Sequence, residues 1–214
     1  MNVLNTVSTR DALVDELRTL ILSGELEPGT PLTETGLSEK FGVARPTVRS
    51  ALQVLTARHL AVQSEGRSVI VPDLDISDVR DLYFVRLPLE LECVSAIVER
   101  NLSLDEAHAQ LSVMEQLPDT ADWVRRVEAH TAFHVAIVDA VGSPRLSRVY
   151  STLQDEIQLC LAQIKDSYPQ RQELAIEHRA LLDDLRSGDL DRARAQMRAH
   201  LAGAVTNFIR HSAS

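Results

Sequence analysis

The sequence predicts a mainly α-helical protein, in which a small winged helix-turn-helix domain precedes an all-helical bundle of about six helices. Apolar residues recur at spacings of three and four through most of the 214 residues, which is the helical period. Two short β-like runs between residues 60 and 71 flank a turn and predict a hairpin. Pro72-Asp73 then starts a linker, so we expect domains at 1–73 and 74–214.

Three helices and the hairpin make up the first predicted domain. Gly24 and Gly42 stand where two of the helices should end, and Pro46 suits the first turn of the third. The second and third helices are separated by three or four residues, which is the spacing of a helix-turn-helix. The predicted helices are Thr9–Ser23, Glu34–Phe41 and one within VARPTVRSALQVLTARHL, and the predicted strands are Leu60–Gln63 and Ser68–Val71.

The second domain shows only helical patterns, separated by proline and glycine breaks. A Ser-Leu-Asp-Glu run beginning at Ser103 has the spacing of a capping box, and it predicts the start of one helix at Leu104. The predicted helices are Ser77–Asn101, Leu104–Glu115, Thr120–Val141, Pro144–Ser167, Gln170–Ser187 and Leu190–His211.

Composition excludes several classes of protein. Cys93 and Cys160 lie far apart in apolar runs, so we expect small buried side chains rather than a disulfide framework. No run of 18 apolar residues and no charged leader followed by an apolar stretch is present, which predicts a cytoplasmic protein without membrane contact. The net charge of −9 is uneven, because residues 1–72 hold 7 Lys/Arg against 8 Asp/Glu. The first domain can therefore still carry a basic face.

The start of the third helix carries residues suited to DNA. Arg45, Thr47 and Arg49 lie at its N-terminal end, which is the end that enters the major groove in helix-turn-helix proteins. Arginine can bind guanine or phosphate, and threonine can bind phosphate or contact a thymine methyl. Arg67, beside Gly66 at the hairpin tip, can reach the minor groove or backbone. The alternative from pattern alone is an ordinary solvated helix face.

The first domain resembles the GntR family of bacterial regulators. The resemblance covers nearly all of residues 9–72 and rests on ILSGELEPGTPL and FGVARPTVRSAL, in order and spacing. It implies a homodimer that binds a palindromic double-stranded DNA operator through Arg45, Thr47, Arg49 and the wing at Gly66. Two positions depart from the family pattern. Ala44 replaces the usual Ser or Thr, and Thr35 stands where some members have a DNA-contacting Arg, so base preference does not carry over.

Four histidines of the second domain lie in apolar helical surroundings. His130 and His134 are four residues apart and share one helix face, while His178 and His200 lie in later helices. Neutral imidazole is the commonest metal ligand, and facing helices of a bundle can converge such ligands on one ion. The spacing alone is more typical of ordinary, partly buried histidines than of a metal site.

The second domain resembles the FCD branch of the GntR family. The resemblance runs through DLYFVRLPLELECVSAIVER, HTAFHVAIVDAVGSPRL and EHRALLDDLRSGDLDRARAQMRAHL. Many members hold a divalent ion with one Asp and three His. His134, His178 and His200 match those histidines, and His130 stands in the position of the Asp. Four neutral ligands should shift the preference toward transition metals, with Zn²⁺ first and Ni²⁺ next, and away from Mn²⁺ and Mg²⁺.

The resemblance also implies that the ion keeps open positions for a small carboxylate effector, whose binding releases a repressor from DNA. We assign Arg86 to grip the effector, with Arg148 in reserve; the alternative for Arg86 is an ion pair with Glu90, four residues on.

The sequence leaves two alternative functions, a metal-free sensor and a metalloenzyme. A metal-free sensor would use the same DNA reader with an apolar pocket for an acyl chain. A metalloenzyme would need a catalytic group, but the sequence has no HExxH, no GxSxG and no phosphate-binding glycine loop. We therefore expect a regulator and not an enzyme.

Overall fold

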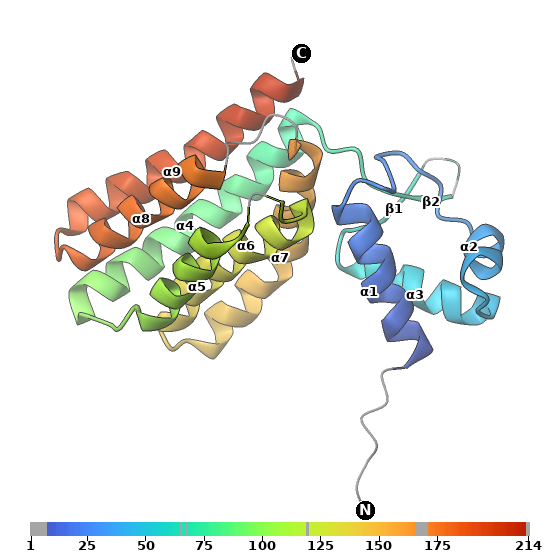
Figure 1. Ribbon diagram of the computed structural model, residues 1–214, viewed down its shortest axis with the longest axis horizontal. Coiled ribbons are helices and arrows are strands. Elements are labelled where there is room, and N and C mark those ends of the chain that lie inside the picture. Colours follow the sequence, from blue (N-terminus) through green and yellow to red (C-terminus); the bar gives the residue numbers. More distant parts are fainter. Residues whose placement is uncertain (1–7, 65, 67, 119, 166–170, 213–214) are drawn as a thin grey trace, which may run out of the picture. The chain divides into compact units, whose positions relative to one another are not determined.

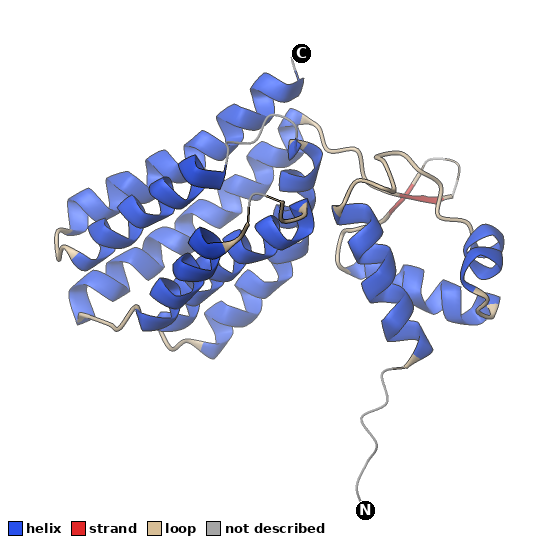
Figure 2. Ribbon diagram, viewed as in Figure 1, coloured by secondary structure: helices blue, strands red, loops and turns tan. Residues whose placement is uncertain are grey.

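The computed structural model describes residues 8–64, 66, 68–118, 120–165 and 171–212. The chain divides into two compact units, Met1–Asp73 and Leu74–Ser214. Figure 1 labels the helices and strands of each unit, and Figure 2 shows the short hairpin in red among helices. The predicted mainly helical architecture is confirmed.

The first unit is built around the packing of α1 (Thr9–Leu22) on α3 (Arg45–Ala57), with α2 (Glu34–Phe41) also packed on α3. Gly24 (φ +83°) follows α1 and Gly42 (φ +64°) follows α2, so both adopt the left-handed conformation expected where a helix ends. Only residues 42–44 separate α2 from α3. This short turn sets the two helices as a helix-turn-helix and leaves the start of α3 at the surface.

The hairpin strands are shorter than predicted. β1 (Val62–Gln63) pairs antiparallel with β2 (Val69–Ile70). Leu60 and Ala61 are fully buried at the end of α3 instead of joining β1, because the domain core takes up their side chains. The backbone N–H of Leu32 donates to the carbonyl of Val69 at 2.8 Å, and this bond ties the hairpin to the segment before α2.

The second unit is a bundle of six helices, α4 to α9, which lie lengthwise beside one another in Figure 1. The long α4 packs against α6, α7, α8 and α9, so it lies at the centre of the bundle. Around it, α5 contacts α6 and α8, α6 contacts α7, and α8 contacts α9. The helices are α4 (Ile76–Arg100), α5 (Asp105–Gln116), α6 (Trp123–Ala140), α7 (Pro144–Gln163), α8 (Arg171–Arg186) and α9 (Leu190–Ser212).

Helix ends differ from the predictions where side-chain caps intervene. α6 begins three residues later than expected, because the Asp122 side chain accepts a hydrogen bond from the backbone N–H of Arg125 at 2.8 Å. The predicted capping box at Ser103 is wrong. Its hydroxyl bonds within the turn to Asp105, and Leu104 caps α5 without a side-chain bond. α7 ends at Gln163, and residues 166–170, to which its predicted end extended, lie outside the described residues.

Both cysteines are buried and unpaired, as expected. Among the helices that the structure describes, none is long and apolar enough to cross a membrane.

Candidate metal centre and nucleic-acid interface

The four histidines lie together inside the helical unit. α6 supplies His130 and His134, α8 supplies His178, and α9 supplies His200. One nitrogen from each ring falls within 4.8 Å of the others. The first three are at most 3% exposed, so the cluster is in the core rather than on a solvated face.

Three of the rings converge through the same nitrogen. The Nε2 atom of His134 lies 3.3 Å from that of His178 and 3.2 Å from that of His200. Two nitrogens bound tetrahedrally to one Zn²⁺ at about 2.0–2.1 Å lie about 3.3–3.4 Å apart. The two separations from His134 Nε2 therefore fit a tetrahedral ion.

Hydrogen bonds at the opposite ring nitrogens leave two of these Nε2 atoms without a proton. His178 Nδ1 lies 2.7 Å from the carbonyl oxygen of Leu174, which only accepts, and His134 Nδ1 lies 2.8 Å from a carboxylate oxygen of Glu90. Each Nδ1 therefore carries the ring proton, and the two Nε2 lone pairs face each other. A cation between them would stabilise this arrangement, so the residues fit a metal ion.

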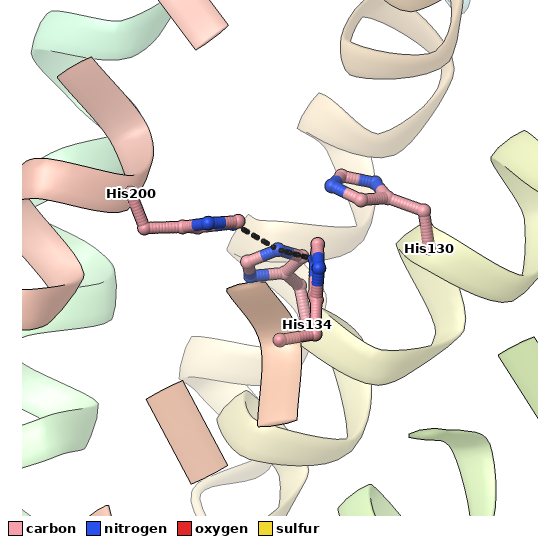
Figure 3. A group of neighbouring side chains, drawn as sticks. His130, His134 and His200 are labelled. Carbon is pink, nitrogen blue, oxygen red and sulfur yellow. Dashed lines mark hydrogen bonds between the residues drawn. The ribbon is translucent and has the colours of Figure 1, made fainter. Parts of the chain in front are cut away.

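His130 is the fourth member of the cluster and lies nearer to His134 and His178 than to His200. Its ring centroid lies 4.8 Å from those of His134 and His178 and 6.4 Å from that of His200. Figure 3 shows its ring apart from the close approach of His134 and His200.

Burial keeps the cluster neutral. It is the largest cause that lowers the pKa of all four imidazoles, and positive charge on neighbouring imidazoles or on Arg86 lowers these pKa values further. For His178 the pKa falls to about 4. Metal binding requires unprotonated nitrogens, which this environment supplies at neutral pH.

These lowered pKa values predict that the metal-free protein loses stability in mild acid. Below about pH 6.5 the unfolded chain binds protons at these histidines and the folded chain does not. The free energy of unfolding should therefore fall as the pH drops from about 6.5, and for His178 the fall should continue to pH about 4. Urea unfolding of chelator-treated protein at several pH values between 7.5 and 5 measures this change in the free energy of unfolding.

Two variants isolate this effect from the carboxylates that titrate in the same range. His178→Leu should flatten the pH dependence, whereas replacement of the exposed His108 should leave it unchanged. Equal slopes for wild type and His178→Leu would contradict the prediction.

A buried polar network adjoins the cluster. Arg86 is 1% exposed, and its Nε donates to Glu90 Oε1 at 2.5 Å. Tyr150 Oη donates to the same oxygen at 2.8 Å, and Arg86 Nη1 donates to Tyr83 Oη at 3.2 Å. The alternative interpretation of Arg86, an ion pair with Glu90, is thus present. Its Nη2 is nevertheless buried without a hydrogen-bond partner among the described residues, which leaves the two N–H groups of that nitrogen available to a ligand.

The structure does not bring Arg148 to this network. Its residue is exposed on α7, and within the described chain no side-chain contact joins it to the histidines. Tyr150, two residues on, reaches Glu90 instead. The sequence suggested Glu90 as a partner of Arg86 but not of His134, and it gave no sign of the contacts from Tyr83 and Tyr150. Burial of Glu90 in the apolar run RLPLELE was the available signal, since a carboxylate is rarely buried unless it is paired.

The predicted DNA-contacting residues lie at the surface of the first unit. Arg45 is exposed, Thr47 is half-buried, and the Arg49 side chain is 63% exposed. Gly66 is described and exposed, whereas Arg67 lies outside the described residues. α3 begins without a side-chain cap at Ala44, as its residue type predicts.

A groove of about 590 Å³ lies between α3 and the hairpin. Thr56 and Gln53 of α3 line it with Gln63 and Ser68 of the hairpin segment, and so do Arg49 and Glu34.

Within this groove Arg49 is already paired. Its guanidinium donates to both carboxylate oxygens of Glu34, at 2.6 and 2.8 Å, and the bond to Arg49 lowers the pKa of Glu34. Sequence reasoning missed this pair, because the two residues are 15 positions apart on different helices. The ion pair therefore holds the Arg49 side chain against Glu34 in the groove.

Each of the two units matches a known protein family. Residues 9–71 match the family model "Bacterial regulatory proteins, gntR family", and residues 81–203 match the FCD domain. The HTH-type transcriptional regulator LutR of Bacillus subtilis is 28% identical over 206 residues, which cover 85% of this chain and 93% of LutR. The gluconate operon transcriptional repressor of Bacillus licheniformis is 24% identical over 197 residues, with 88% and 80% covered.

Solved structures show the same fold. A putative transcriptional regulator GntR from Rhodococcus sp. RHA1 superposes with a TM-score of 0.80 at 22% identity, and 94% of this chain and 97% of that one are covered. E. coli McbR/YncC gives a TM-score of 0.74 at 22% identity, with 96% and 99% covered. These relatives are transcriptional regulators and not enzymes. This chain therefore belongs to the GntR family of bacterial regulatory proteins, and its helical unit is an FCD domain.

Proposed function

We propose that the protein is a ligand-responsive repressor that binds DNA through the exposed start of α3. The observation that carries this proposal is the placement of Arg45, Thr47 and Arg49 at the surface of a helix-turn-helix whose other face is buried. Arginines at this end of a recognition helix can read guanine in the major groove, and the groove toward the hairpin can accommodate the adjacent DNA backbone. The wing, at Gly66 and Arg67, then reaches the minor groove.

The proposed working form is a homodimer. Two recognition helices about 34 Å apart would read the two halves of a palindrome on successive turns of DNA. Apolar side chains exposed on two packed helices support self-association: Phe84 is 77% exposed and Val85 41% exposed on α4, and Val149 is 50% exposed on α7. A second copy that covers this surface would remove it from water.

The sensor is proposed to hold a divalent transition metal, with Zn²⁺ first and Ni²⁺ second. His134, His178 and His200 are its ligands through Nε2, and His130 is the fourth candidate. The spacing of the three nitrogens and the purely imidazole donor set support these metals over Mn²⁺ and Mg²⁺, which prefer oxygen ligands. The ion would supply a Lewis-acid position for an anionic ligand.

A small carboxylate is the proposed effector. The buried, unpartnered Nη2 of Arg86 supports this class, because a guanidinium binds carboxylate oxygens strongly. Arg148 stays a reserve candidate. One relative is named for the gluconate operon, and gluconate is itself a carboxylate. Effector binding would favour one arrangement of the two readers over another, typically by about 1–3 kcal/mol, and so release the operator.

The experiment that tests the DNA function is selection of bound duplexes from a random library by the full chain, purified without a His-tag. We expect an enriched sequence with dyad symmetry and half-sites about 10 base pairs apart, because the dimer spans one helical turn. The affinity for it should fall steeply with salt. A screen of small carboxylates for release from this sequence then identifies the effector. Enrichment of no sequence over the starting library would contradict the proposal.

Metal analysis of the same preparation separates the proposed sensor from a metal-free one. A metal-free protein with full operator binding would favour the alternative, a pocket for an apolar ligand.

A further inference from the structure

Glu90 is a fully buried carboxylate whose contacts join the histidine cluster to Arg86. It lies on α4 and is 0% exposed. Its Oε2 atom lies 2.8 Å from His134 Nδ1, while Oε1 accepts hydrogen bonds from Arg86 and Tyr150. Both oxygens are therefore used.

The bond to His134 determines which ring nitrogen is available. An ionised carboxylate paired with a guanidinium only accepts hydrogen bonds, so it holds the proton on Nδ1 and leaves the Nε2 lone pair free. That lone pair faces the nitrogens of His178 and His200. Without Glu90, His134 could equally carry its proton on Nε2, which would block the point where the three nitrogens meet.

Charge gives Glu90 a second role. A divalent ion among neutral imidazoles adds two positive charges to a core that already contains Arg86, and buried charge is costly without a counter-charge. In the described chain, two carboxylates approach the four rings. Glu177 lies 4.0 Å from His200 Nδ1 but is 54% exposed, so water screens it. Glu90 is shielded from water, so its negative charge acts on the ion as well as on Arg86, with which it is paired.

We propose that Glu90 is the positioning residue of the metal site: it orients His134 Nε2 toward the ion and supplies the negative charge that the imidazole ligands lack. This proposal rests on the proposed metal site. Glu90 would not itself bind the ion. A carboxylate that accepts a hydrogen bond from a metal-ligating histidine raises the basicity of the ring, and its loss typically changes metal affinity about 10–100-fold.

The first test compares the Zn²⁺ affinities of metal-free wild type, Glu90→Gln and Glu92→Gln by competition with a coloured chelator. Glu90→Gln should bind Zn²⁺ about 10–100-fold more weakly, because the amide keeps the shape but loses the charge. Glu92→Gln removes a carboxylate from the exposed side of the same helix and should stay within about twofold of wild type. A folded Glu90→Gln protein with wild-type Zn²⁺ affinity overturns the proposal. Failure of the wild type to bind either Zn²⁺ or Ni²⁺ instead overturns the metal site itself.

A second measurement needs no substitution at Glu90, whose loss would leave Arg86 buried without its counter-charge. Nitrogen-15 shifts of the histidine rings in metal-free wild type report the tautomer of each ring, with His134→Asn used for assignment. We expect the proton of His134 on Nδ1. A proton on Nε2 would overturn the proposal even if the Glu90 variant failed to fold.

Discussion

Replacement of His134 and His178 together by alanine should abolish stoichiometric metal binding and leave DNA binding in place. These two rings contribute Nε2 atoms that lie 3.3 Å apart, and an ion left with His200 and His130 would lose two of the three converging nitrogens. Metal analysis by mass spectrometry, on protein without a His-tag, measures the ratio of ion to chain. A variant with His108 replaced, which removes an exposed imidazole, should keep the wild-type ratio.

The same pair of proteins gives a stability readout. A ligand that binds only the folded state stabilises it by about 4 kcal/mol when present at roughly 1,000 times its Kd. Added Zn²⁺ should therefore raise the Tm of wild type and the His108 variant but not that of the double variant. Retention of one ion per chain by the double variant would discredit the site. DNA binding by its folded dimer would show that the ion is not needed to build the reader.

Replacement of Arg49 by alanine should weaken operator binding by about 1–3 kcal/mol, or roughly 5–150-fold, if its guanidinium contacts a base. If it contacts a phosphate, binding should weaken on all sequences and the salt slope should fall by about one. The ion pair with Glu34 competes only weakly with a DNA contact of Arg49, because an exposed ion pair contributes at most about 1 kcal/mol. Arg49 can therefore exchange Glu34 for DNA. Fluorescence anisotropy at several salt concentrations distinguishes the two contacts.

The control for Arg49 is Arg100→Ala, which removes one exposed positive charge from the FCD unit at the end of α4. Its operator affinity should match that of wild type within about twofold, since screening at physiological salt limits long-range effects. If Arg49→Ala binds the operator as tightly as this control at matched salt, Arg49 does not contact DNA.

Local chemistry explains how much of the fold the sequence could predict. α2 was predicted with its observed ends because Gly42 adopts the left-handed conformation that closes a helix. The start of α3 followed from Pro46, whose missing N–H costs nothing in a first turn. The hairpin was predicted too long because the burial of Leu60 and Ala61 in the domain core is a tertiary property.

The candidate sites were also predicted in part from the sequence and decided in part by the packing of the helices. The spacing of His130 and His134 showed that they share a helix face, and resemblance pointed to His178 and His200. The convergence of the four imidazoles depended on how α6, α8 and α9 pack. The contact of Glu90 with His134 and that of Glu34 with Arg49 arise only across the fold, at separations of 44 and 15 residues, whereas Arg86 and Glu90 are neighbours on α4.

The sequence by itself determined the helices, the turn of the DNA-reading motif and the family, because these depend on residue type and spacing along one chain. The tertiary structure alone decided which carboxylate lies behind His134, which guanidinium nitrogen of Arg86 lacks a partner, and that Arg49 pairs with Glu34. The physical reason is that a hydrogen bond requires two groups within about 3 Å at a suitable angle. Only the packing of separate helices brings such groups together.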